Sequence, residues 1–162
     1  MKQVLLGVVA LVTLGAATPA DADYRYGYGH RHYYSSWSYS PQKSYYYRRY
    51  HYKPYSSYSG YKQHYCIYYP SKPRYVYYYN PHRKTYWGRL DLEGKEGEQY
   101  SLLAPEDRKE NLEDIPEKAF PKPGAFPKVP DKDLKDDLTV PPMKDGKPKA
   151  DAIELNDPPA DE

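Results

Sequence analysis

The sequence is short of the residues from which protein cores are usually built. From Asp23 to Glu162, leucine, isoleucine, valine and phenylalanine together number 16 in 140 residues, and the mean hydropathy of the chain is -1.05. Chains with less than roughly 20% of these four residues tend to be disordered. Burying so few apolar groups, at roughly 25 cal/mol per Å², does not offset an ordering cost of about 1 to 2 kcal/mol per residue. The composition therefore predicts a mostly disordered chain without a large core.

The chain has only one long hydrophobic run, and it lies at the N-terminus. A basic start at Lys2 is followed by an apolar run from Val4 to Ala17, and Ala20 and Ala22 stand at the -3 and -1 positions of a cleavage site. This order is typical of a secretory signal peptide, and the run is shorter than the roughly 20 residues that cross a bilayer. We therefore expect a signal peptide at residues 1–22. The mature chain, without a transmembrane segment, should be secreted or held in the cell envelope or periplasm.

Cysteine is nearly absent, since Cys66 is the only one. No disulfide can therefore form within the chain, although exported proteins reach compartments where disulfides persist. An unpaired cysteine in such a protein either stays free or pairs between molecules. Both alternatives stay open here: an incidental thiol, or an intermolecular disulfide through Cys66.

Acidic residues are missing from Tyr24 to Leu90, where 12 lysines and arginines, all five histidines and 22 of the 23 tyrosines lie. Residues 91–162 reverse this balance, with 20 acidic against 11 basic residues and 11 of the 17 prolines. The chain is thus a block polyampholyte, and such asymmetry concerns partners and solubility. Because we expect the chain to be exported, its basic half favours anionic envelope polymers over intracellular nucleic acid as partners.

Motifs of catalysis and cofactor binding are also absent. The sequence has no glycine-rich phosphate loop, no His-Glu-x-x-His, no Gly-x-Ser-x-Gly and no paired-cysteine knuckle. A catalytic group must be held within about half an ångström by packed neighbours, so we predict no enzymatic activity and no cofactor. His30, His32, His51 and His64 are of a type that binds transition metals. Arg31 between the first two, and the lack of nearby carboxylates, disfavour a specific metal site.

Residues 23–73 form a tyrosine-rich, basic, low-complexity region. Alternating polar and aromatic residues of this kind are usually disordered and prone to self-association. Arginine or lysine over a tyrosine ring contributes about 0.5 to 1 kcal/mol when exposed, so many such contacts can make a segment adhesive. The predicted adhesive residues are Arg25, Arg31, Tyr45, Tyr46, Tyr47, Arg48, Arg49 and Tyr50. The alternative is a solvated spacer.

Residues 74–127 differ, because apolar and aromatic residues recur there between turn signals. Residues 75–79 and 85–91 flank an Asn-Pro turn and predict a β-hairpin, to which residues 99–103 can add a third strand. Pro105 and Asp114 are typical of the starts of short helical turns. The sequence thus predicts one small β-rich module, three-stranded and antiparallel with short helical turns. An acidic, proline-rich, disordered tail at 128–162 should follow it.

Two resemblances fall within this module. The sequence Tyr-Tyr-Tyr-Asn-Pro, followed by Thr-Tyr-Trp, resembles in part the second and third strands of a WW domain, which binds proline-rich peptides. The Asn80 to Trp87 spacing is one residue shorter than in that family, and its first-strand tryptophan has no counterpart here. From about Tyr77 to Gly124, the motifs Tyr-Trp-Gly-Arg, Asp-Leu-Glu-Gly-Lys, Tyr-Ser-Leu-Leu and Ile-Pro-Glu-Lys-Ala-Phe-Pro-Lys-Pro-Gly resemble small exported proteins of planctomycete-type bacteria. That resemblance implies no activity and no site residues.

Two functions follow from these features. The first is an exported, non-enzymatic structural or interaction protein, whose adhesive segment binds anionic envelope polymers or other copies of the chain. The alternative is specific ligand or peptide binding by the module, with a binding face formed by Tyr77, Tyr79, Tyr86 and Trp87. Oxidative cross-linking of tyrosines into an insoluble layer is a third hypothesis.

Overall fold

The prediction of a mostly disordered chain is wrong. A computed structural model describes residues 31–135, 138–140, 143, 146–149 and 154–155, and these residues build a β-sheet of seven antiparallel strands with a short eighth strand parallel to β2. The predicted signal peptide with Ala20 and Ala22, and the predicted adhesive residue Arg25, lie outside the described residues.

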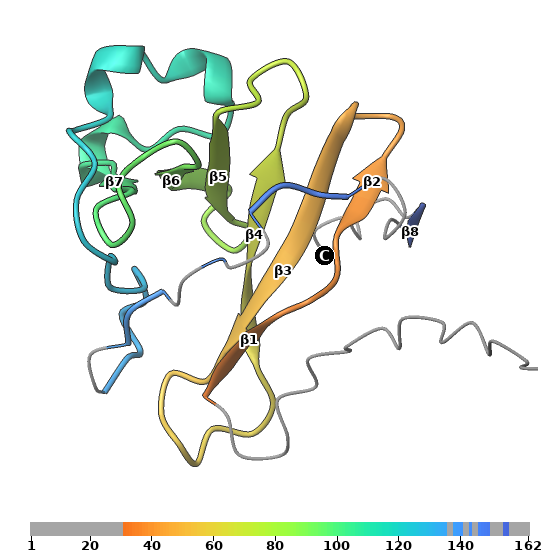
Figure 1. Cartoon of the computed structure of the whole chain (residues 1–162). Helices are drawn as coiled ribbons and strands as arrows, with labels where there is room; N and C mark the ends of the chain where they lie inside the picture. Colours follow the sequence, from red (N-terminus) through yellow and green to blue (C-terminus); the bar gives the residue numbers. More distant parts are fainter. Residues whose placement is uncertain (1–30, 136–137, 141–142, 144–145, 150–153, 156–162) are drawn as a thin grey trace, which may run out of the picture.

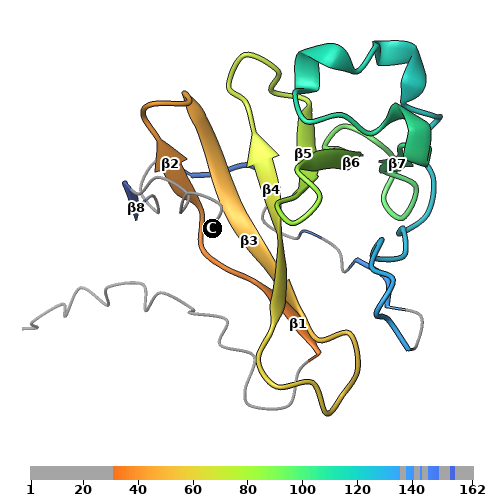
Figure 2. The same cartoon turned by 180° about the vertical axis from the view of Figure 1, so that it is seen from behind.

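The sheet has the strand order β7-β6-β5-β4-β3-β2-β8, and β1 pairs with β3 (Figures 1 and 2). Three 3-10 helices lie beside β5, β6 and β7, at the opposite end of the sheet from β2 and β8 (Figure 1). The strands are β1 (His32–Tyr34), β2 (Ser38–Ser40), β3 (Tyr45–Tyr52), β4 (Lys62–Tyr68), β5 (Tyr75–Asn80), β6 (Thr85–Asp91), β7 (Tyr100–Leu102) and β8 (Glu154–Leu155), and the helices are η1 (Pro105–Asp107), η2 (Leu112–Asp114) and η3 (Glu117–Ala119).

The tyrosine-rich region forms strands because its side chains follow the two-residue period of a β-strand. In β3, Tyr45 and Tyr47 pack on one face of the sheet and Tyr50 and Tyr52 on the other. Both faces of the central strands therefore carry aromatic rings. Because aromatic rings lie on both faces, other parts of the chain must pack on each face to keep these rings out of water.

The two faces are covered by different parts of the chain. We call the first the tail face, because Val129, Leu138, Val140 and Met143 pack on it against Tyr50, Tyr52, Tyr78 and Trp87. We call the second the turn face, because Leu103, Leu112, Ile115 and Phe120, from the segment that contains η1 to η3, pack on it against Tyr47, Tyr65, Tyr77 and Tyr86. Val129, Leu138 and Val140, predicted to belong to a disordered tail, thus help to complete a core.

Tyrosine is the physical reason for the wrong prediction. A count of aliphatic residues ignores it, yet each buried tyrosine removes about 150 to 250 Å² from water. Its hydroxyl must then find a partner, and here several tyrosines bond to one another: the Tyr69 and Tyr86 oxygens are 2.7 Å apart, and those of Tyr34 and Tyr78 are 3.4 Å apart. The sheet is therefore built largely from aromatic residues.

The predicted three-stranded module is not a separate unit. Strands β5, β6 and β7 lie in its range, but β5 also pairs with β4 from Tyr65↔Tyr79 to Tyr68↔Val76. The sheet thus continues across the predicted boundary at residue 74 into the tyrosine-rich region. One core on each face joins the two segments.

Cys66 lies in the middle of the sheet, on β4, with no exposed surface and no disulfide. Burial raises the pKa of its thiol, and this effect outweighs the opposing influence of the Arg48 charge. A disulfide to a second chain would therefore require the sheet to open around Cys66. Among the described residues, no helix is long and apolar enough to cross a membrane.

Candidate functional site

The predicted binding face lies mostly in the interior. Trp87, Tyr77 and Tyr86 are buried, and Tyr79 is half-buried. Trp87 lies at an irregularity in the pairing of β5 with β6 between Tyr78 and Tyr79, and its ring packs on the tail face while Tyr77 and Tyr86 pack on the turn face. These four side chains therefore do not form one exposed surface.

The predicted adhesive residues also make most of their contacts within the chain. Tyr45, Tyr47 and Tyr50 are buried, and Tyr46 is half-buried.

The predicted adhesive arginines contact aromatic rings and backbone carbonyls of the chain itself. The guanidinium of Arg48 lies 4.9 Å from the ring centre of Tyr34 and 5.3 Å from that of Trp37, while its Nε donates to the Ser35 carbonyl at 2.8 Å. Arg49 lies 5.9 Å from the Tyr47 ring, and Arg31 donates to the Pro54 carbonyl at 3.1 Å. Cation–π contacts thus stabilise the fold itself.

The histidines are not brought together. His51 follows Tyr50 on β3 and stacks on Tyr33, whereas His64 on β4 packs against Trp87 on the tail face. Alternation along the paired strands places His51 and His64 on opposite faces of the sheet. Within the described part of the chain, no group of three histidine, cysteine or acidic residues is arranged to hold a metal ion. His30 lies outside that part.

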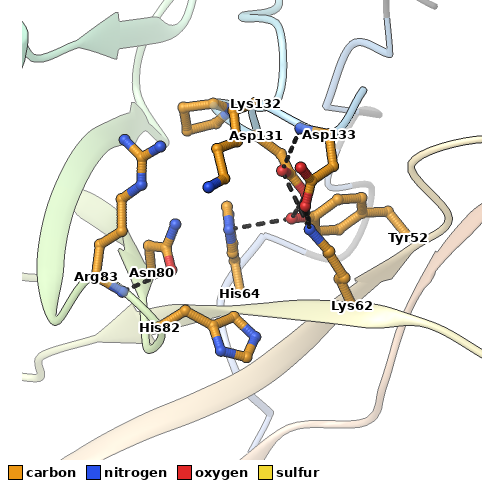
Figure 3. Close-up of a pocket in the computed structure, with 10 residues that line it drawn as sticks. Tyr52, Lys62, His64, Asn80, His82, Arg83, Asp131, Lys132 and Asp133 are labelled. Atoms are coloured by element: carbon orange, nitrogen blue, oxygen red, sulfur yellow. Dashed lines mark hydrogen bonds and ion pairs between the residues drawn. The ribbon is translucent and has the colours of Figure 1, made fainter. Parts of the chain in front are cut away.

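A pocket of about 340 Å³ lies beside His64. It forms where the end of β3, the start of β4, the turn between β5 and β6 and the segment 130–133 meet. Figure 3 shows Arg83 and Asn80 on one side of His64, and Tyr52 and Lys62 on the other. Its lining is mainly polar and comprises Tyr52, Lys62, His64, Asn80, His82, Arg83, Pro130, Asp131, Lys132 and Asp133.

One wall of the pocket is a hydrogen-bonded network around Asp131. The Tyr52 hydroxyl donates to Asp131 Oδ2 at 2.8 Å, and Lys62 Nζ donates to Asp131 Oδ2 at 2.9 Å and to Asp133 Oδ2 at 2.5 Å. Partial burial alone would raise the pKa of Asp131, but the Asp133 N–H, Lys62 and Tyr52 lower it overall. The single charge of Lys62 therefore neutralises one of the two carboxylates, and the network keeps one net negative charge.

His64 forms the floor of the pocket as a neutral base. Burial lowers the pKa of His64 to about 3, although the Asp131 carboxylate opposes this shift. The Tyr52 oxygen lies 3.4 Å from His64 Nε2. Because Tyr52 gives its hydrogen to Asp131, the ring hydrogen of His64 belongs on Nε2. The buried Nδ1 is then an acceptor, and it has no hydrogen-bond partner among the described residues.

The opposite side of the pocket is basic. Arg83 belongs to the turn after β5, where its N–H donates to Asn80 Oδ1 at 3.2 Å, and Lys132 extends toward His64 (Figure 3). Neither side chain forms an ion pair with the described residues, whereas Lys62 already pairs with both aspartates. Within the described part of the chain, the pocket thus combines two cations outside any ion pair with a buried tyrosine and a buried histidine.

The buried His64 predicts that stability falls in mild acid. In the unfolded chain the pKa of histidine is near 6.5, so between that value and about 3 the unfolded state binds more protons than the folded state. The free energy of unfolding therefore decreases as the pH falls through this window. Between pH 7 and pH 5, His64 lowers the free energy of unfolding by about 2 kcal/mol.

This effect is measured by urea unfolding at pH 7 and pH 5. His64→Gln should reduce the difference between the two pH values by about 2 kcal/mol. We expect His51 to account for another part of the pH dependence of stability, because burial and then the Arg49 charge lower the pKa of that residue to about 4. An unchanged difference in His64→Gln would contradict the buried neutral imidazole.

The chain was compared with protein families, curated proteins and solved structures. None of them matches.

Sequence reasoning did not find this pocket, although it named His64 as a possible metal ligand. Lys62 and Asp131 are 69 residues apart in the sequence, and Tyr52 and Asp131 are 79 apart. The expectation of a disordered tail removed Asp131 and Lys132 from consideration. The one available signal was the Asp-Lys-Asp sequence at 131–133, which by itself is typical of an exposed charged loop.

Proposed function

We propose that the protein is an exported, non-enzymatic binding protein that holds an anionic group of an envelope polymer in the pocket beside His64. The observation that carries this proposal is the position of Arg83 and Lys132. Both line a pocket in which the aspartates are already paired with Lys62. An entering anion therefore meets two cations that have no ionic partner among the described residues.

The chemistry of the lining favours a carboxylate or phosphate group. The planar guanidinium of arginine matches such groups with two parallel hydrogen bonds, and a lysine ammonium adds a point charge. Tyr52 and His64 are buried and fixed by the sheet, so part of the pocket is formed before a ligand arrives. Its volume of about 340 Å³ lies within the range of small-molecule sites, about 300 to 1,000 Å³.

The same geometry supports binding rather than catalysis. A general base works best when its pKa is near the operating pH, and burial places the pKa of His64 at about 3. Burial and then the hydrogen bond to Asp131 raise the pKa of Tyr52, so its phenol stays protonated at neutral pH. The Tyr52 hydroxyl is already bonded to Asp131 and His64 Nδ1 is buried, so these two groups shape the pocket and leave the anion to Arg83 and Lys132.

The test is titration of the mature chain with galacturonate and with inorganic phosphate, followed by NMR and calorimetry. We expect the peaks of Arg83, Lys132 and His64 to shift together. The double variant Arg83→Ala/Lys132→Ala should bind at least tenfold more weakly, because hydrogen bonds to charged groups contribute about 1.5 to 3 kcal/mol each.

The control is Lys118→Ala/Lys122→Ala, which removes the same charge at exposed residues outside the pocket lining. It should bind like the unchanged protein. Equal loss in both double variants would show a general charge effect and contradict the proposed site, as would the absence of binding in the unchanged protein.

A further inference from the structure

A second hollow adjoins the pocket beside His64. Its volume is about 430 Å³, and it shares Lys62, Lys132 and Asp133 with the first. The shared wall includes the Lys62–Asp133 ion pair, with Nζ 2.5 Å from Oδ2. The two hollows are therefore neighbouring parts of one groove, which follows the segment 130–135.

The second hollow differs from the first because a pair of tyrosine rings lines it. Tyr55 and Tyr58, in the loop between β3 and β4, line it with ring centres 5.3 Å apart and planes at 89°. The Lys135 ammonium lies 4.4 Å from the Tyr55 ring centre, and the Lys135 N–H donates to the Pro54 carbonyl at 3.3 Å. The Tyr58 N–H donates to the Tyr55 carbonyl at 3.0 Å. These bonds hold both rings in the groove wall.

We propose that this groove binds an acidic oligosaccharide, with a sugar carboxylate at Arg83 and Lys132 and the next sugar ring against Tyr55 and Tyr58. The proposal rests on the function proposed above and specifies its ligand class. A pyranose ring has a face of C–H groups, which pack on the electron-rich face of a tyrosine. Its hydroxyls need hydrogen-bond acceptors as well as donors.

The mixture of charges in the groove favours a sugar over a polyphosphate or nucleic acid. Asp133 lines both hollows and Asp131 lines the first. Carboxylates accept hydrogen bonds from the hydroxyl groups that every unit of an acidic sugar carries, whereas a polyphosphate has no such donors. A groove for such a chain is expected to be lined by cations and aromatic rings alone.

The test compares galacturonate with its trimer, trigalacturonate, on the full mature chain. We expect the trimer to bind at least tenfold more tightly than the monomer. In the double variant Tyr55→Leu/Tyr58→Leu this gain should disappear while monomer binding is kept, which also shows that the variant is folded. Tyr55→Phe/Tyr58→Phe, which keeps the rings, should keep the gain. The matched control is Tyr61→Leu, because Tyr61 is exposed in the same loop and lines neither hollow.

The outcomes separate this inference from the proposed function. If the monomer does not bind the unchanged protein, the anion site itself is wrong. If the monomer binds but the trimer is no tighter, or if the leucine variant keeps the gain, only the extended groove is wrong. Sodium tripolyphosphate could also bind more tightly than inorganic phosphate, by the same factor that separates trigalacturonate from galacturonate. That result would overturn the choice of a sugar ligand.

Discussion

Replacing Trp87 with alanine is expected to destabilise the protein by about 3 to 5 kcal/mol, the usual cost of removing a buried tryptophan. Trp87 is 1% exposed, and its ring centre lies 4.9 Å from that of Tyr78 and 5.6 Å from that of His64. No single neighbour can fill the space it leaves. Since small domains have total stabilities of about 5 to 15 kcal/mol, this loss removes a large part of the total.

Urea unfolding followed by tyrosine fluorescence or circular dichroism measures this effect. Leu102→Ala is the control, because Leu102 lies on the neighbouring strand β7 and is 38% exposed, so its substitution should cost less than about 1 kcal/mol. A surface role for Trp87 predicts the opposite pattern, in which binding is lost and stability is kept. Equal midpoints for Trp87→Ala and the unchanged protein would contradict the core position.

Replacing Val140 with aspartate is expected to unfold the protein or to cost more than about 4 kcal/mol. Val140 has no exposed surface, packs on the tail face and donates its N–H to the Pro127 carbonyl at 2.9 Å. A carboxylate there would be buried without a partner, which is among the most costly changes in a protein.

The matched control is the adjacent residue. Thr139→Asp introduces the same charge one position away, at an exposed side chain, and should change stability by about 0.5 kcal/mol or less. The measurement is thermal unfolding together with the dispersion of the amide NMR spectrum. A disordered tail would make the two substitutions equivalent, so similar melting temperatures for both would contradict the packing of Val140 on the sheet.

The individual strands were within reach of the sequence. The Asn-Pro turn and its flanking aromatic residues predicted the hairpin from which β5 and β6 are built, and the turn near Gly94 and Gly97 indicated a strand close to β7. These signals are local, because a turn and the two-residue alternation of a strand depend on neighbouring residues. The tyrosine-rich region has the same alternation. It was interpreted as disorder because the count of core-forming residues left tyrosine out.

The candidate site was beyond such signals, because it depends on contacts between distant segments. The pocket needs Asp131 beside Tyr52 and Lys62, and the groove needs Lys135 over Tyr55. Each pair joins the segment after residue 127 to the region before residue 73. The local sequence around one residue of such a pair does not indicate which distant residue it contacts.

The sequence by itself determined the charge separation, the single cysteine, the shortage of aliphatic residues and the places of the turns, because composition and local backbone preferences are properties of short segments. Only the tertiary structure decided which tyrosines are buried, because burial depends on which segment covers each face of the sheet. It also decided that Val129, Leu138 and Val140 cover the tail face, and that Arg83 and Lys132, distant in sequence, line one pocket with His64. These arrangements form because the aromatic side chains on both faces of the sheet are stabilised when other segments of the chain bury them.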